Sequence, residues 1–135
     1  MQTAYIILAL SGVLTVLLWT PYILARLFVW GLPTFLHNYP AGFPVEQPAP
    51  PLWAERARRA HLNMVETLPA FVAVTLAAIH LAEGTEFRSL ALWTQIFLAA
   101  RLVHAPVYIL GIPYLRTPVY LVSWAAILMI GYLAL

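Results

Sequence analysis

A dense group of polar side chains runs directly into an apolar segment between residues 55 and 69. Four of these side chains follow one another at steps of four, four and three residues: Glu55, Arg59, Asn63 and Glu66. Residues at these steps share one face of an α-helix. Charged and amide groups are costly beside hydrocarbon, so they turn toward a bundle interior or a water-filled cavity and often mark functional sites. The spacing therefore predicts a polar stripe that faces a binding site.

Two further stripes lie later in the sequence. Arg101, His104 and Tyr108 are separated by three and four residues, and Arg116 precedes Tyr120 by four. All three stripes fall toward the same predicted end of their helices, so a compact bundle can bring them to one pocket. The pocket would be basic with a few acidic and amide groups, which predicts an anionic ligand.

The composition points to a membrane protein. Hydrophobic residues make up 63% of the 135 residues and charged residues 9%, against about 45–50% and about 25% in soluble domains. The net charge of +2 is too small and too scattered to indicate nucleic acid as a partner. The sequence contains no cysteine, which excludes disulfides and a cysteine nucleophile from the protein. Any thiol chemistry must come from a ligand.

The predicted fold is an all-α membrane protein, a four-helix bundle in one domain over residues 1–135. Its apolar segments are long enough to cross a bilayer of roughly 30 Å. The segment 31–51 contains six prolines, a density that predicts an extended loop without helix, which could cover a site like a lid. The predicted helices span about residues 3–30, 52–82, 87–110 and 117–135.

The arginines predict the orientation in the membrane. Only Arg88 lies near the connection between the second and third helices. The other six lie toward the first and third connections: Arg26, Arg56, Arg58, Arg59, Arg101 and Arg116. By the positive-inside tendency, the first and third connections face the cytoplasm and both termini face the opposite side. Arg56 and Arg58 are interpreted mainly as headgroup anchors.

Two stretches resemble the MAPEG family, the membrane-associated proteins in eicosanoid and glutathione metabolism. The first is RAHLNMVETLPAF, residues 59–71. The second is ARLVHAPVY, residues 100–108, followed by LRTPVY, residues 115–120. The resemblance covers essentially the whole chain. It implies a bacterial-type homotrimer in the inner membrane, with glutathione sites between neighbouring protomers and lipophilic small molecules as substrates.

The resemblance also implies roles for individual residues. Carried over by position, the helix residues that hold glutathione are Arg59, Asn63, Glu66, Arg101, His104, Tyr108 and Tyr120, with Arg26 contributing from the first helix. Arg116 resembles the family arginine that stabilises the glutathione thiolate. A neighbouring cation lowers the pKa of a thiol from about 8.5, so such an arginine raises the nucleophilic fraction at neutral pH. No protein base is then required, and no histidine–glutamate set has the spacing of metal ligands.

Three alternatives stay open from the sequence. Matching the Leu-Arg-x-Pro string in the other register places Tyr120 where some relatives carry the catalytic arginine, so Arg116 would not be the activating residue. The protein would then be a non-catalytic trimer that binds glutathione or another anionic or lipid ligand. A small multidrug transporter fits the length, but it requires a membrane-embedded acid, for which Glu66 is the single candidate.

Overall fold

The computed structural model describes residues 1–37, 49–81 and 86–135. These residues form helices and connecting segments, without a strand. The helices are α1 (Gln2–Trp30), α2 (Leu32–Leu36), α3 (Leu52–Leu81), α4 (Glu86–Leu110) and α5 (Arg116–Tyr132). Most of the predicted proline-rich loop lies outside the described residues.

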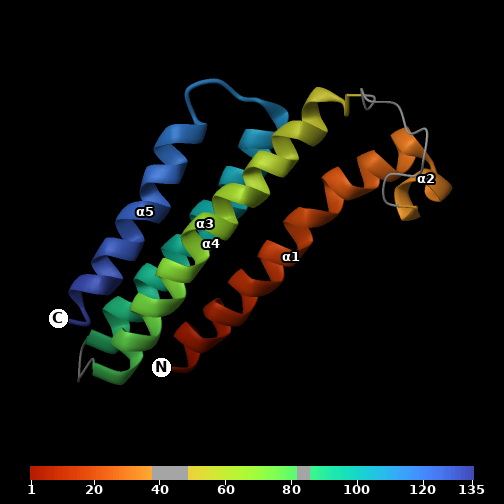
Figure 1. Ribbon diagram of the computed structural model, residues 1–135. Coiled ribbons are helices and arrows are strands. Elements are labelled where there is room, and N and C mark those ends of the chain that lie inside the picture. The colour runs from red at the N-terminus through yellow and green to blue at the C-terminus, as the bar shows by residue number, and fades with distance from the viewer. Residues whose placement is uncertain (38–48, 82–85) are drawn as a thin grey trace.

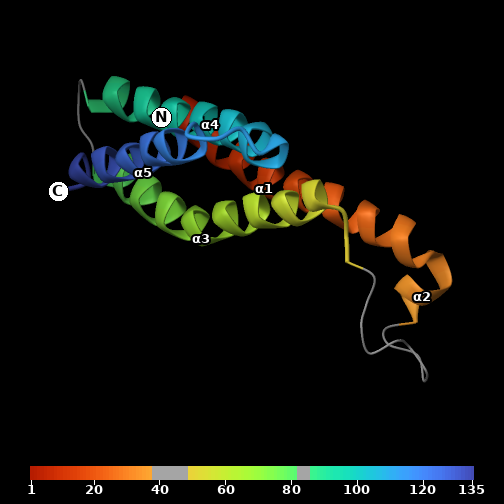
Figure 2. The same cartoon turned by 90° about the horizontal axis from the view of Figure 1, so that it is seen from above.

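The four long helices run alternately up and down (Figure 1). Both termini lie at one end of the bundle, and the opposite end carries the start of α3, the end of α4 and the start of α5. Helix α3 packs against α1, α4 and α5, and α4 packs against α1 and α5. Seen from above, α1 extends beyond the others toward α2 (Figure 2). The helix segments that carry the three predicted polar stripes therefore lie toward one end of the bundle.

Three of the helices are long and apolar enough to cross a membrane: α1, α3 and α4. Helix α5 has 17 residues, and it ends at Tyr132 rather than at residue 135 as predicted, because the last residues form a turn. Helix α1 continues through Pro21. The chain therefore has the helices of a membrane protein.

The core lies where α3 crosses α4. The rings of Phe71 and Phe97 are stacked with centroids 3.8 Å apart and planes at 9°, and both residues are fully buried. Ile130 of α5 is buried in the same cluster, as is Ala4 of α1. Within a membrane such rings stabilise the helix pair through van der Waals packing rather than through removal of area from water, and this packing fixes the crossing point of α3 and α4.

The prediction that residues 31–51 contain no helix is wrong at its start. Helix α2 occupies Leu32–Leu36, with Pro33 in its first turn. A proline there lacks an N–H that would have no partner in the helix anyway, and its fixed φ suits the helix. Gly31 separates α1 from α2 with a φ of 75°, a left-handed conformation that glycine adopts without strain.

Candidate functional site

The candidate site lies at the bundle end where α3 begins and α4 ends. A cavity there has a volume of about 500 Å³ and is called the large cavity. Three arginines contribute to it, together with one glutamate and several apolar side chains. Its lining residues are Leu52, Glu55, Arg56, Arg59, Val107, Tyr108, Gly111, Ile112, Pro113, Tyr114 and Arg116. One carboxylate among three guanidinium groups leaves the cavity strongly positive, which suits an anionic ligand.

A second cavity of about 170 Å³ lies beside the first and is called the small cavity. It is lined by Asn63, His104, Tyr108, Arg116, Thr117 and Tyr120. Tyr108 and Arg116 line both cavities. The Arg116 guanidinium carbon is 5.5 Å from the centre of the Tyr108 ring, a cation–π contact. This pair forms the shared wall, so Arg116 can act on a group in either cavity.

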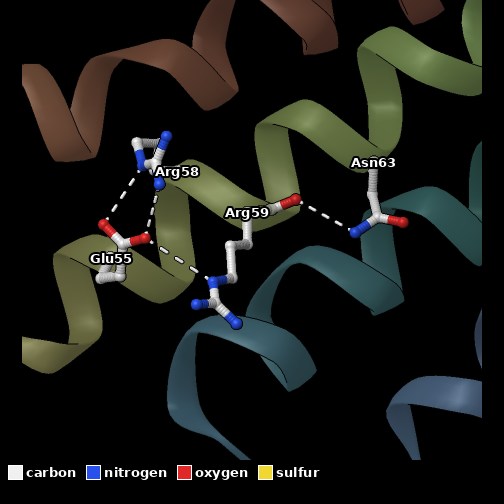
Figure 3. Close-up of polar contacts among 4 residues, drawn as sticks. All are labelled: Glu55, Arg58, Arg59 and Asn63. Atoms are coloured by element: carbon white, nitrogen blue, oxygen red, sulfur yellow. Dashed lines mark hydrogen bonds and ion pairs between the residues drawn. The ribbon is translucent and has the colours of Figure 1, made fainter.

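The first turns of α3 hold a network of polar contacts (Figure 3). Glu55 accepts two hydrogen bonds from Arg58, at 2.7 and 3.1 Å, and Arg59 Nε lies 3.6 Å from the same carboxylate. The amide of Asn63 donates to the backbone oxygen of Arg59 at 3.1 Å. The Arg59 side chain remains 62% exposed. Its guanidinium is therefore held loosely and can reach a ligand in the large cavity.

The end of α4 is fixed by a glycine and an arginine. Gly111 has a φ of 70°, and the N–H groups of Gly111 and Ile112 donate to the carbonyls of Tyr108 and Val107. These bonds make a Schellman motif, which closes the helix. The guanidinium of Arg56 lies where a β-carbon on Gly111 would stand, and it donates to the carbonyl of Leu110 at 3.5 Å. The cation thus sits at the negative end of α4.

The connection from α4 to α5 carries an unusual residue. Tyr114 has a φ of 66°, a left-handed conformation that costs a residue other than glycine about 1–2 kcal/mol. Its side chain is exposed and lines the large cavity. The tight connection brings Arg116, the first residue of α5, back beside Tyr108 of α4.

The rings of α4 and α5 form the wall of the small cavity. His104 lies between two tyrosines, with ring centres 5.5 Å from Tyr108 and 6.0 Å from Tyr120. His104 is buried, whereas Tyr108 and Tyr120 are half-buried. The second and third stripes therefore converge, as the spacing predicted.

Three of the predicted ligand-binding residues do not line either cavity. Arg101 is 2% exposed and lies in the core, where it donates a hydrogen bond to the Thr67 hydroxyl. Glu66 is exposed on α3. Arg26 lies on α1, with its guanidinium carbon 5.2 Å from the centre of the Trp30 ring. Within one chain, these side chains are thus separate from the two cavities.

The sequence interpretation missed several residues of the large cavity, among them Arg56 and Gly111. Arg56 was assigned to headgroups, although it precedes Arg59 by three residues and so shares its face of α3. Gly111 lies just after the predicted third helix, and the packing of Arg56 against it was not predicted. The spacing of three residues from Arg59 could have indicated Arg56. The contact of Arg56 with Gly111 could not be predicted, because it depends on how α3 packs against α4.

The described residues offer no metal site. No group of three histidine, aspartate or glutamate side chains within the ranges 1–37, 49–81 and 86–135 could hold an ion. The chemistry of the lining is instead that of an anion site, with arginine forks that match carboxylates.

Comparison with known proteins identifies the family of the chain. No curated protein matches the chain significantly. A sequence model of the MAPEG family matches residues 3–135, essentially the whole chain. The family is one of membrane proteins, in keeping with three helices long and apolar enough to span a bilayer. The chain belongs to the MAPEG family.

Proposed function

We propose that this protein is an integral membrane enzyme that uses glutathione to conjugate, reduce or isomerise lipophilic electrophiles or lipid hydroperoxides. The observation that carries the proposal is the place of Arg116, which lines both cavities and lies over the Tyr108 ring. A guanidinium at this wall can hold a thiolate in one cavity while the rest of the ligand occupies the other.

The donor set of the large cavity fits glutathione. This tripeptide carries two carboxylates and one ammonium group at neutral pH. Arg56 and Arg59 offer planar forks for carboxylates, and Glu55 offers a carboxylate that could accept from the ammonium. Asn63 from the small cavity adds an amide. A volume of about 500 Å³ lies within the range of small-molecule sites, roughly 300–1,000 Å³.

Arg116 supplies the chemistry in this proposal. Its positive charge favours the thiolate over the thiol, and the sulfur electron pair then forms a bond to the substrate. At an electrophilic carbon, the displaced electron pair leaves with the leaving group or moves onto the conjugated acceptor. At a peroxide oxygen, the O–O bond breaks, the released alkoxide takes a proton from solvent, and a second glutathione reduces the resulting sulfenic acid to the disulfide. The protein needs no base of its own, because the thiol loses its proton to solvent. His104 and Tyr120 give the small cavity an aromatic wall, and a charge beside such a wall is less screened than one in open water.

Assembly and topology form part of the same proposal. We infer a homotrimer in which Arg26 and Glu66 reach the site of a neighbouring protomer, since both are placed away from the cavities of their own chain. Helix α5 would be the fourth span, because 17 residues extend ~26 Å at 1.5 Å per residue. The cavities would open to the cytoplasm of a bacterial inner membrane, where the arginines of the first and third connections lie.

The test is the ultraviolet thiolate absorbance when glutathione is titrated into the purified protein at pH 7. We expect a thiolate signal in the wild type and about a tenfold lower thiolate-to-thiol ratio in Arg116→Gln, since each pKa unit corresponds to a factor of ten. Arg88→Gln is the matched control, because Arg88 is exposed near the start of α4, far along the helix from Tyr108. An unchanged signal in Arg116→Gln would refute the role of Arg116.

A non-catalytic function is the second candidate. Tyr120 rather than a second arginine lines the small cavity. In the alternative register of the Leu-Arg-x-Pro string, Tyr120 stands where some relatives carry the catalytic arginine, and the activating residue would then be missing. In that case the protein would bind glutathione or another anion through the same arginines. Calorimetric binding without any thiolate absorbance would favour this function over catalysis.

A further inference from the structure

Arg101 is a buried cation without a carboxylate partner. It is 2% exposed, and the ion pairs among the described residues involve Glu55 and not Arg101. Its guanidinium donates to the Thr67 hydroxyl, whereas Nε and Nη1 have no hydrogen-bond partner. Buried charges in proteins are normally paired, because an unpaired one costs several kcal/mol. This arrangement is unfavourable unless something else compensates the charge.

The neighbours of Arg101 are two aromatic rings. The guanidinium carbon lies 5.6 Å from the centre of the Phe97 ring and 5.1 Å from that of Tyr120. Tyr120 also lines the small cavity and lies 6.0 Å from the ring of His104. Cation–π contacts compensate part of the charge, since the ring faces are negative. The two cation–π contacts therefore leave a net positive potential around Arg101, next to the Tyr120 ring.

The field of Arg101 reaches the small cavity. Tyr120 lines this cavity, and its ring centre lies only 5.1 Å from the Arg101 guanidinium carbon. The cavity thus has Arg116 in its wall and Arg101 behind the Tyr120 ring. Inside a protein, charges separated by a ring are poorly screened. A negative group in this cavity would be attracted by two cations rather than one.

We propose that Arg101 is a positioning residue whose buried charge acts through the Tyr120 ring to favour an anion, the glutathione thiolate, in the small cavity. The inference rests on the proposed function and adds a second cation to it. A nearby cation commonly shifts the pKa of an acidic group by one unit or more, so the expected effect is on the order of tenfold in the thiolate-to-thiol ratio.

The experiment compares the wild type with Arg101→Met and Arg101→Lys in detergent micelles. Methionine is long and unbranched, so it fills the space of the arginine without the charge. Thr67 keeps its hydrogen bonds to the carbonyls of Asn63 and Met64 in that variant. Three quantities are measured: the melting temperature without ligand, the thiolate absorbance with glutathione at pH 7, and the affinity for S-methylglutathione, a thioether that cannot form a thiolate.

We expect Arg101→Met to melt at or above the wild-type temperature and to bind S-methylglutathione within about twofold of wild type. Its thiolate-to-thiol ratio should fall about tenfold, and Arg101→Lys should restore most of it. A wild-type ratio in Arg101→Met would overturn the inference. So would a lower melting temperature together with weaker S-methylglutathione binding, because Arg101 would then serve the packing of the core.

The outcome also separates this inference from the proposed function. If the wild type binds neither glutathione nor S-methylglutathione, the proposed function fails. The melting temperatures then show whether the buried charge of Arg101 is uncompensated. A higher melting temperature for Arg101→Met would support an uncompensated buried charge that awaits another anion. A lower one would overturn the inference as well.

Discussion

Replacing Gly111 by alanine should damage the large cavity by displacing Arg56, one of its lining arginines. Gly111 has a φ of 70°, and alanine in this conformation costs about 1–2 kcal/mol. The new β-carbon would also stand in the place of the Arg56 guanidinium. Moving Arg56 away breaks its exposed hydrogen bond to the Leu110 carbonyl, roughly a further 0.5 kcal/mol. The sum is a destabilisation of about 2 kcal/mol.

The assay is reversible unfolding of the purified protein in mixed detergent micelles, read by helical circular dichroism. Gly12→Ala is the matched control, because a β-carbon at Gly12 meets open space within α1. Alanine is a better helix former than glycine by about 0.5–1 kcal/mol, so this control should be stabilised. The same glycine-to-alanine change should therefore lower the free energy of unfolding at residue 111 and raise it at residue 12.

The same variant should bind glutathione less tightly. Arg56 is one of three arginines in the large cavity, and its displacement should weaken binding about tenfold, which corresponds to about 1.4 kcal/mol. The reasoning is refuted if Gly111→Ala is as stable as Gly12→Ala, since neither the left-handed conformation nor the packing of Arg56 would then matter.

Further measurements test other parts of the structure. Phe71→Ala should lower the free energy of unfolding by about 3–5 kcal/mol because its stacked ring is fully buried, whereas Phe28→Ala, at a residue 81% exposed, should change it little; equal effects would contradict the position of the core. Glu55→Gln should cost less than about 1 kcal/mol, and the cost should shrink at high salt, because its ion pairs are partly exposed. Tyr22→Phe should cost about 0.5–1.5 kcal/mol, since it removes the 3.3 Å hydrogen bond to His61 but keeps the stacked rings; a larger loss of stability would mean that the hydroxyl has another buried partner.

The local pattern of the sequence was sufficient to predict the long helices. Apolar runs of more than twenty residues determine membrane spans, because backbone groups in lipid must be satisfied within the helix. Steps of three and four residues also predicted correctly that His104 and Tyr108 share a face with each other, and that Arg116 and Tyr120 do. The family followed from the same stretches. These features depend on neighbours along the chain, which the sequence contains explicitly.

Only the tertiary structure decided which polar residues reach a cavity. Arg101 shares the face of His104, yet Tyr120 of α5 covers it and leaves it in the core. Arg56, assigned to headgroups from the sequence, closes the end of α4 because Gly111 lacks a side chain there. Periodicity fixes the face of a helix on which a residue lies. It does not fix how deep that face is buried or which partner helix covers it, because these depend on the packing of segments far apart in the sequence.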